Sequence, residues 1–301
     1  MIGLAGIDMV RQAYPHRGCD LRRYRGYAVA EGLGIAMGSW ALVTGASSGI
    51  GAAFARQLAG RGMNVAVVAR SGVKLEALAA ELRERCGVEA LVIVRDLAEP
   101  DAAERVGEAV DAAGIAVEVL VNNAGIGTFG RDTSIGAEYS RDTAMVNMVA
   151  VAGLIKRFLP AMCARGSGAV VNVASMAGFQ AQPYMALYAA TKAFVVNYSL
   201  GLWAETRGTG VKVLAVCPGP VDTGFPIANG IKYDEGRLGW LLADPEKVVR
   251  QSLRALDRDR GYVVPDARNW PEAHLLPRRP RKLMTRLIGA VLKRFADYQE
   301  R

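Results

Sequence analysis

Two side chains that could exchange a proton with a substrate lie one helical turn apart, at Tyr188 and Lys192. A free phenol titrates at about 10, which is too high for easy proton exchange at neutral pH. A lysine ammonium one turn away would favour the phenolate, so Lys192 is expected to lower the pKa of Tyr188. Ser175, thirteen residues before the tyrosine, could donate a hydrogen bond to a developing alkoxide. These residues together predict reduction of a carbonyl group, or the reverse oxidation of an alcohol.

A glycine-rich turn far upstream could hold the phosphates of a dinucleotide. It reads TGASSGIG over residues 44–51, after an expected strand and before a helix that should begin near Ile50. Small residues let the backbone approach a pyrophosphate, and a helix N-terminus supplies free N–H groups and a positive dipole. An ordinary tight turn between a strand and a helix would look similar. The predicted phosphate-binding residues are Gly45, Ser47, Ser48, Gly49, Ile50 and Gly51.

The end of the second expected strand indicates which dinucleotide is bound. An NAD-selective protein usually has an acidic residue here to bind both ribose hydroxyls, but this chain reads Ala69-Arg70-Ser71. No carboxylate is present to repel a 2′-phosphate, and the Arg70 guanidinium could pair with one. The sequence therefore favours NADP(H) over NAD(H). The alternative is a solvated arginine at the start of a helix.

The ends of the third and fourth expected strands also carry polar residues. Asp96 could bind the adenine amino group, although a helix N-cap is an equally simple role for it. The run Asn122-Asn123-Ala124-Gly125 offers two short amides and a permissive glycine, which suit the bracing of strands around a cofactor. The predicted cofactor contacts here are Asp96, Leu97, Asn123, Ala124 and Gly125.

The motifs follow short apolar runs that alternate with helical stretches. One such stretch is 71–86, where Ser71 could cap a helix with leucines at helical spacing. Strands that are apolar throughout and separated by helices indicate a parallel sheet covered on both faces, so we predict a doubly wound α/β fold with ligands at the carboxyl ends of the strands. The expected strands are 40–44, 65–69, 90–94, 117–121, 169–173, 211–216 and 262–264.

The composition of the 301-residue chain excludes several other kinds of chemistry. There are only two histidines, His16 and His274, and neither lies in the central region, which removes most Ser-His-Asp and Cys-His schemes. The four cysteines are widely spaced without a CxxC pair, so we expect no metal site, no disulfide framework and a reduced, cytoplasmic setting. The sequence contains no run of about twenty uninterrupted apolar residues, so we do not expect a membrane span.

The net charge of +8 lies mainly at the two ends of the chain. Residues 1–38 are interpreted as an extension, residues 39–270 as one catalytic domain and residues 271–301 as a basic C-terminal segment. Residues 1–36 carry +2 and residues 271–301 carry +5, which leaves the body nearly neutral. Met37 lies just before the first expected strand, so it is an alternative start of the protein.

The motifs TGASSGIG, NNAG, Asn147, Ser175, YAATK and Pro218-Gly219 occur in an order that resembles the short-chain dehydrogenase/reductase family. The resemblance covers about residues 40–264 and implies a single Rossmann domain. It implies that Asn147, Ser175, Tyr188 and Lys192 form the catalytic tetrad. The resemblance also implies that Lys192 binds the nicotinamide ribose and that Asn147 holds a water molecule, which links Lys192 to solvent. The cofactor contacts that it adds are Tyr188, Lys192, Pro218, Gly219, Val221 and Thr223.

Apolar residues around these motifs favour a hydrophobic carbonyl substrate, such as a steroid, 3-oxoacyl or polyketide-like ketone. The predicted substrate contacts are Ser175, Met176, Phe179, Tyr184 and Phe225. Pro226, Leu238, Trp240, Leu241 and Leu242 follow the Pro-Gly turn, where the family usually builds a mobile lid. The alternative is that these apolar residues pack within the lid or form a subunit contact.

The C-terminal segment could form a basic amphipathic helix. Its apolar positions are Leu283, Leu287, Ile288, Val291, Leu292 and Phe295. Such a helix could dock on the enzyme or on a partner subunit, or it could lie on an anionic membrane as a peripheral contact. The basic cluster has no recognition motif for nucleic acid, so we do not expect nucleic-acid binding.

We therefore expect an NADP(H)-dependent reductase or dehydrogenase, which the resemblance makes a homodimer or homotetramer. A sensor or scaffold that binds a dinucleotide but has lost turnover is the alternative from another class. An epimerase that uses the hydride transiently is a third interpretation, although the spacing TGxxxGxG resembles simple reductases more closely.

Overall fold

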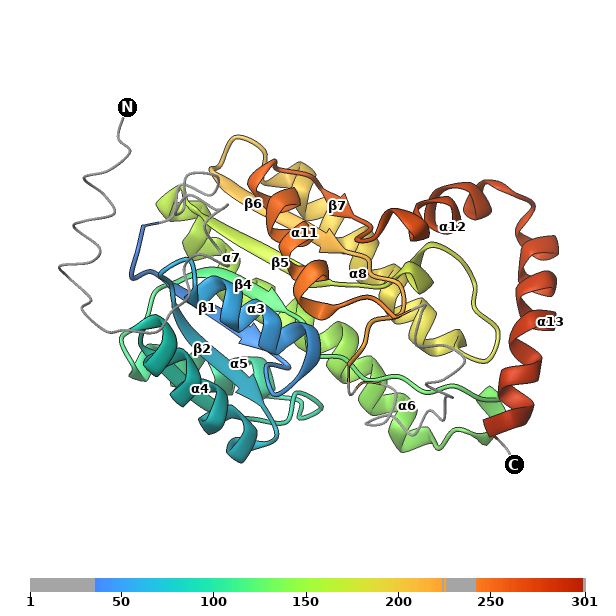
Figure 1. The fold of residues 1–301 in the computed structure, drawn as a ribbon, viewed down its shortest axis with the longest axis horizontal. Helices are drawn as coiled ribbons and strands as arrows, with labels where there is room; N and C mark the ends of the chain where they lie inside the picture. Colours follow the sequence, from blue (N-terminus) through green and yellow to red (C-terminus); the bar gives the residue numbers. More distant parts are fainter. Residues whose placement is uncertain (1–35, 224, 226–241, 300–301) are drawn as a thin grey trace.

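The computed structural model describes residues 36–223, 225 and 242–299 of the chain. Within these residues, parallel strands form one sheet in the order β3-β2-β1-β4-β5-β6-β7 (Figure 1). The strands are β1 (Trp40–Thr44), β2 (Asn64–Ala69), β3 (Ala90–Val94), β4 (Val117–Asn122), β5 (Gly168–Val173), β6 (Val211–Val216) and β7 (Tyr262–Val263). The order reverses beside β1, so the fold is the predicted doubly wound α/β sheet.

The strands form where the chain is apolar on both faces of the sheet. In β1, Ala41 and Val43 are buried in the core on one face and Leu42 is buried in the core on the other. Such runs suit strands covered by helices on both sides, and β-branched side chains fit the pleated surface well. Three strands have the predicted bounds, and the other four differ from them by one residue at one end.

Helices cover both faces of the sheet (Figure 1). The face that carries Val43 is covered by α3 (Gly49–Ala59), α4 (Gly72–Cys86) and α11 (Pro245–Asp257). The face that carries Leu42 is covered by α5 (Ala102–Ala112), α7 (Ala150–Arg165) and α8 (Ala186–Glu205). Shorter elements in the connections are η1 (Asp132–Ser134), α6 (Ala137–Ala144), the π-helical turn η2 (Met145–Val149) and η3 (Met176–Phe179).

Two helix starts differ in detail from the predictions. Ser71 is the N-cap residue of α4, but its side chain makes no capping hydrogen bond. Asp96 does not cap α5, because Asp101 occupies that position. The Asp96 carboxylate instead accepts a hydrogen bond from the Ala98 N–H at 3.0 Å. This local turn holds Asp96 at the carboxyl end of β3, where a ligand could reach it.

One continuous helical stretch is long and apolar enough to cross a membrane, by length and composition alone. It runs from Ala137 to Arg165 through α6, η2 and α7, and an 18-residue window reaches a mean hydropathy of 1.4. In the folded protein, 44% of that window is buried, and α7 packs against α5, β4 and β5. The core helix of a globular domain passes the same test, so this stretch is weak evidence for a membrane span.

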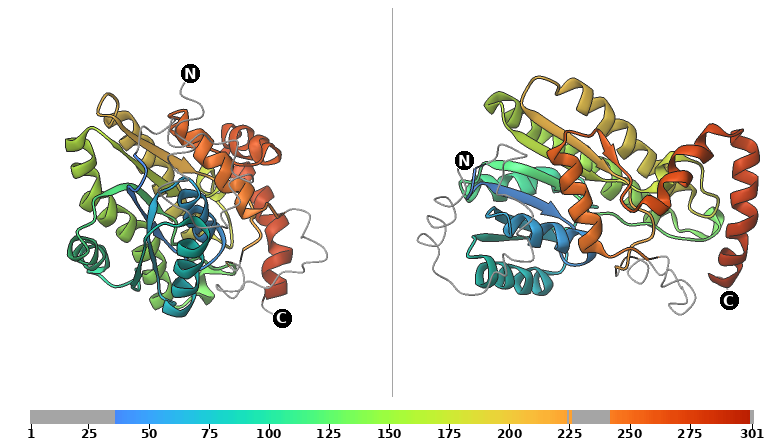
Figure 2. Two further views of the ribbon diagram at one scale, coloured as in Figure 1. Left: turned by 60° about the vertical axis from the view of Figure 1, so that its left-hand side comes forward. Right: turned by 45° about the horizontal axis from the view of Figure 1, so that its top comes forward.

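The chain after β7 leaves the sheet and forms one end of the molecule (Figures 1 and 2). The elements there are η5 (Ala267–Asn269), α12 (Trp270–Leu275), η6 (Leu276–Arg278) and α13 (Arg281–Gln299). The helix expected in the basic segment is therefore present as α13. Residues 1–35 of the predicted extension lie outside the described residues.

Candidate active site

The carboxyl ends of the central strands open into one cleft of about 680 Å³. Such clefts are where doubly wound sheets bind their ligands. The predicted cofactor residues that line it are Gly45, Ser47, Ser48, Gly49, Ile50, Arg70, Asp96, Leu97, Asn123, Ala124, Gly125, Tyr188, Lys192, Pro218, Gly219, Val221 and Thr223. Gly51 is the one predicted cofactor residue that does not line the cleft, since it is buried beneath the glycine turn.

The glycine turn has no room for side chains at its key positions. A Cβ atom on Gly51 would lie 2.3 Å from the carbonyl oxygen of Gly45. A Cβ atom on Gly49 would lie 2.7 Å from Cγ2 of Thr223. Gly45 also has a φ of +64°, in the left-handed region that favours glycine. The turn therefore forms a backbone cradle above the start of α3, which fits the phosphates of a dinucleotide.

Asn123 braces this cradle from the neighbouring strand β4. Its Nδ2 donates hydrogen bonds to the carbonyl oxygens of Thr44 at 2.9 Å and Gly45 at 3.2 Å. The Thr44 hydroxyl oxygen accepts hydrogen bonds from the backbone N–H groups of Asn123 and Ala124, at 3.0 and 3.1 Å. These bonds lock the ends of β1 and β4 together, so the glycine turn is held in shape before a ligand arrives.

The end of the cleft beside β2 and β3 is positively charged. Arg70, Lys74 and Arg95 line it. The Arg70 guanidinium lies 3.9 Å from the Asp96 carboxylate, but both side chains are well exposed, so this pair is weak. Nε of Arg95 is buried and has no hydrogen-bond partner among the described residues, so it is a donor that a phosphate oxygen could accept from. These groups fit a nucleotide with an extra phosphate.

Lys74 and Arg95 are not among the residues predicted from the sequence. Lys74 stands four residues after Arg70, at the start of α4, so helical spacing could have identified it. Arg95 lies directly before Asp96, and no pattern distinguishes it from a solvated arginine. Its position at the cleft follows from the pairing of β3 with β2, which sequence spacing does not show.

Three of the predicted catalytic residues meet at the other end of the cleft, where Ser175, Tyr188 and Lys192 line the wall. Lys192 is only 4% exposed, and its Nζ lies 5.7 Å from the centre of the Tyr188 ring. The ammonium donates a hydrogen bond to the carbonyl oxygen of Val173 at 2.9 Å. The Ser175 hydroxyl oxygen accepts a hydrogen bond from the Ala177 N–H at 3.1 Å, which orients the serine at the start of η3.

Burial shifts the pKa values of the tyrosine and the lysine in opposite directions. It raises the pKa of the Tyr188 phenol, and interaction with the Ser175 hydroxyl lowers that pKa in part. It lowers the pKa of Lys192 to about 8, while Cys217 acts in the other direction. Burial outweighs the effect of Ser175, so the Tyr188 pKa lies above its usual value, and the expected lowering of this pKa by Lys192 stays a prediction. At neutral pH the phenol is protonated, as a proton donor must be.

Asn147 lies behind the cleft in η2 and is fully buried. Its Oδ1 accepts a hydrogen bond from the Ile126 N–H at 2.9 Å, and its Nδ2 donates to the Ile126 carbonyl oxygen at 2.8 Å. Nδ2 also donates to the Thr191 hydroxyl oxygen at 3.0 Å, and that hydroxyl donates to the Tyr188 carbonyl oxygen at 2.8 Å. Asn147 thus ties the loop after β4 to α8, while its water link to Lys192 stays a prediction.

The predicted substrate residues do not all reach the cleft. Met176 and Phe225 line it, and the Phe225 ring centre lies 5.9 Å from that of Tyr188. Phe179 is not part of the lining, because its ring packs edge to face against Tyr262 at 6.0 Å. The helical turn η3 points Phe179 into the side of the protein that carries β7, which sequence proximity to Ser175 could not show.

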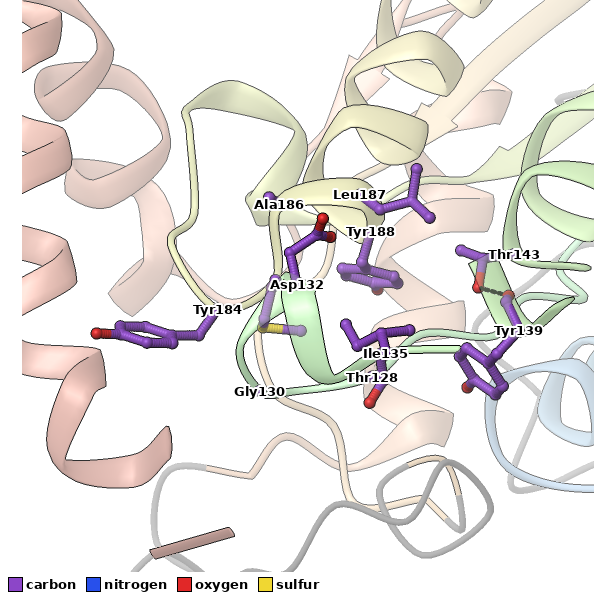
Figure 3. Close-up of a pocket in the computed structure, with 11 residues that line it drawn as sticks. Thr128, Gly130, Asp132, Ile135, Tyr139, Thr143, Tyr184, Ala186, Leu187 and Tyr188 are labelled. Carbon is purple, nitrogen blue, oxygen red and sulfur yellow. Dashed lines mark hydrogen bonds between the residues drawn. The ribbon is translucent and has the colours of Figure 1, made fainter. Parts of the chain in front are cut away.

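Tyr184 lies on a different side of Tyr188. It borders a small cavity of about 20 Å³, and its ring points away from the Tyr188 ring (Figure 3). The Tyr184 ring stacks on Phe129 with the ring centres 6.4 Å apart, and its backbone has a φ of +66°. Tyr184 therefore supports the loop before α8 and does not line the main cleft.

Part of the predicted lid and of the C-terminal segment also borders the cleft. Pro226, Leu238, Trp240 and Leu241 lie outside the described residues. Leu242 lines the cleft, together with Glu272 of α12 and Leu292 of α13. Glu272 has no sequence signal that marks it as a cleft residue. The C-terminal segment thus contributes a wall to the same cleft as the glycine turn.

Replacing Gly127 with Ala is expected to lower kcat on the order of 10-fold, since misplacing a reacting group by 1 Å can cost even more. A Cβ atom at this position would lie 2.4 Å from Cδ2 of Tyr188, so the ring must move. Cofactor affinity, measured by NADPH fluorescence titration, should stay unchanged. Gly136→Ala is the control, because no atom lies within 4 Å of its Cβ position. Equal kcat values for the two variants would show that the Gly127 contact does not position Tyr188.

The described residues offer no metal site. No group of three or more His, Cys, Asp or Glu side chains is placed to hold a metal ion in the described ranges. The three described cysteines are free, and burial raises the pKa of Cys217 to about 12, so its thiol stays neutral beside Lys192.

The fold and the cradle define a dinucleotide-binding protein of the Rossmann type. The family model described as short chain dehydrogenase matches residues 39–231. The chain belongs to the short-chain dehydrogenase/reductase family and is an oxidoreductase of that family. It is 40% identical over 226 residues to a very-long-chain 3-oxoacyl-CoA reductase of Anas platyrhynchos, covering 73% of this chain and 70% of the relative. It is 32% identical to a 7beta-hydroxysteroid dehydrogenase of Collinsella aerofaciens, covering 79% of this chain and 89% of the relative.

Solved structures agree with this assignment. A 7beta-hydroxysteroid dehydrogenase superimposes with a TM-score of 0.78 at 30% identity, covering 87% of this chain and 100% of that one. A short-chain dehydrogenase from Sphingobium yanoikuyae in complex with NADPH gives a TM-score of 0.72 at 32% identity, with 82% and 95% covered. A short-chain dehydrogenase/reductase from Burkholderia phymatum in complex with NAD gives 0.71 at 26% identity, with 79% and 92% covered. Both cofactors therefore occur among similar structures.

Proposed function

We propose that this protein transfers a hydride between NADP(H) and a hydrophobic ketone or secondary alcohol, with Tyr188 as the general acid and base. One observation carries the proposal: a single cleft joins the Tyr188, Ser175 and Lys192 side chains at one end to the cations Arg70, Lys74 and Arg95 at the other. A dinucleotide in the cleft would span these two ends. The glycine cradle lies between them and suits the pyrophosphate.

The residues at the catalytic end have separate tasks. NADPH, when bound, supplies the hydride that forms the new C–H bond at the carbonyl carbon. As the C=O π-bond breaks, Ser175 donates a hydrogen bond to the oxygen, and the Tyr188 O–H bond breaks to give that oxygen its proton. Lys192 holds a positive charge beside the resulting phenolate, which then regains a proton from solvent. Oxidation of the alcohol is the reverse of these steps.

The preference for NADP(H) rests on charge. Arg70 and Lys74 can both approach a 2′-phosphate, and Ala69 brings no carboxylate to repel it. The orphan Nε of Arg95 supplies a further donor. The similar structures include complexes with each cofactor, so the support comes from these residues of the chain itself.

The substrate class rests on the apolar wall at the catalytic end. Met176, Met185, Phe225, Leu242 and Leu292 line the cleft there. Apolar walls with a few polar groups bind hydrophobic ligands and orient their reactive atom. The names of two relatives, a 3-oxoacyl-CoA reductase and a hydroxysteroid dehydrogenase, describe a ketone and a secondary alcohol on hydrophobic skeletons.

The test follows NADPH absorbance with three probes: a long-chain 3-oxoacyl-CoA, a steroid ketone and a small polar ketone. We expect turnover with at least one of the two hydrophobic probes and a much lower kcat/KM with the polar ketone. The relative kcat/KM of the first two identifies the substrate class. Turnover confined to the polar ketone would contradict the hydrophobic assignment.

A sensor or scaffold on the same fold is the alternative. It would bind NADPH tightly, as measured by fluorescence titration, and would turn over none of the probes. The burial of a lysine with a lowered pKa next to Tyr188 favours the enzyme, because such an arrangement opposes folding and is typical of functional sites.

We also propose that the chain assembles as a homodimer or homotetramer. The support is the apolar helical stretch through α6, η2 and α7. Only 44% of its most apolar 18-residue window is buried within the single chain, so apolar surface is left for a subunit contact. Val149 on this stretch is 48% exposed, as a residue in a subunit contact would be in one protomer.

A further inference from the structure

Helix α13 presents two different faces. Its inner face packs on the loop before α8, where Gly289 lies against Pro183, and Leu292 reaches the cleft. Its outer face carries Leu283, Leu287 and Val291, which are 53%, 51% and 62% exposed. These three residues follow one another at intervals of four, so they form one stripe along the helix. The sequence pattern predicted a single apolar face on this helix. In the fold, the apolar residues of the helix are divided between the cleft and the solvent.

Cations lie beside this stripe along the helix. Residues 273–296 contain seven Lys or Arg residues and no Asp or Glu. Arg286 projects from the same outer side as Leu283 and Leu287, and all three are exposed. The helix lies at one end of the molecule, with its outer side away from the sheet (Figures 1 and 2). We call this outer face, with Leu283, Arg286, Leu287 and Val291, the α13 face.

We propose that the α13 face binds an anionic membrane surface. An apolar stripe flanked by lysines and arginines is the pattern that lets a helix lie in the interface, with its side chains among the headgroups and upper acyl chains. Each cation near an anionic surface strengthens this binding further. A second copy of the chain is a poorer occupant, because a two-fold contact through the stripe would bring Arg286 close to its own copy.

This contact would place the cleft beside the lipid. Leu292 lines the cleft from the inner face of the same helix whose outer face carries the stripe. A hydrophobic substrate dissolved in the membrane could then reach the cleft along α13 without crossing bulk water. This last step rests on the proposed function, whereas the binding of α13 to a membrane does not.

The experiment is co-sedimentation of the full chain with vesicles, without substrate or cofactor. We expect binding to vesicles of equal parts phosphatidylcholine and phosphatidylglycerol, and weak binding to phosphatidylcholine alone. Leu287→Gln and Arg286→Gln should each lower the partition coefficient about tenfold, which corresponds to 1.4 kcal/mol. Val73→Gln, an 84% exposed position on α4, is the control and should bind like the natural chain. NADPH affinity reports that each variant is folded.

Three outcomes would overturn the proposal. The first is no binding to anionic vesicles, and the second is binding that Arg286→Gln weakens while Leu287→Gln does not, which indicates adsorption by charge alone. The third is a concentration-dependent mass in solution that Leu287→Gln abolishes, which indicates that a second copy covers the stripe. Because vesicle binding is measured without turnover, failure of the proposed reaction would leave this test intact.

Discussion

Tyr188→Phe is expected to lower kcat for ketone reduction by about 10²–10⁴-fold, the usual contribution of a positioned general acid. The variant keeps the ring that packs on Gly127 and Phe225, so the shape of the site is preserved. The substitution removes the phenol O–H group that protonates the substrate. Ser175 cannot take over this role, because the serine hydroxyl is a much weaker acid. The measurement is single-turnover reduction with saturating NADPH, together with a fluorescence titration that should give an unchanged Kd for NADPH.

Tyr198→Phe is the matched control for this prediction. Tyr198 lies on the same helix α8, but its ring packs against Phe194 and it does not line the cleft. Its removal tests whether loss of a partly buried phenol elsewhere on α8 disturbs the enzyme. A Tyr188→Phe variant that keeps more than a tenth of the natural kcat would disprove the assigned role.

Ala69→Asp is expected to reverse the cofactor preference. The new carboxylate would stand at the end of β2, beside Arg70, where it can accept hydrogen bonds from both ribose hydroxyls of NADH and repel a 2′-phosphate. The ratio of kcat/KM for NADPH to that for NADH should fall by about 10²-fold, since repulsion between like charges can cost several kcal/mol. Initial rates with each cofactor at a fixed ketone concentration give this ratio.

Ala69→Asn separates charge from size. It adds a side chain of nearly the same shape without the negative charge, so the ratio should change far less than in Ala69→Asp. If both variants shift the ratio equally, the effect is steric and charge at Arg70 and Lys74 does not select the cofactor. An unchanged ratio in Ala69→Asp would remove the basis of the NADP(H) assignment.

Much of the fold follows from local sequence. Runs such as residues 211–216 are apolar at nearly every position, and that pattern in six residues is typical of a strand buried on both faces. The predicted strand bounds therefore match to within one residue. The spacing of the glycines at 45, 49 and 51 also implies a turn that only small residues can form, and the cradle has that shape.

The pKa values at the site could not be predicted in the same way. One helical turn between Tyr188 and Lys192 suggests a charge beside the phenol, yet spacing carries no information on how much water remains. In the folded protein, burial raises the Tyr188 pKa and brings that of Lys192 to about 8. Asn147 shows the same limit, because its hydrogen bonds with Ile126 and Thr191 join segments that are far apart in the chain.

The sequence by itself determined the doubly wound sheet, the position of the glycine cradle and the residue types available for proton transfer, because each depends on residues close together in the chain. The tertiary structure alone decided that Arg95 shares a cleft with Arg70, that Phe179 and Tyr184 turn away from it, and that α13 has a solvent face. These outcomes depend on which strands and helices become neighbours. The physical reason is that burial and long-range contacts, which determine charge, exposure and pKa, are properties of packed elements and not of any single segment.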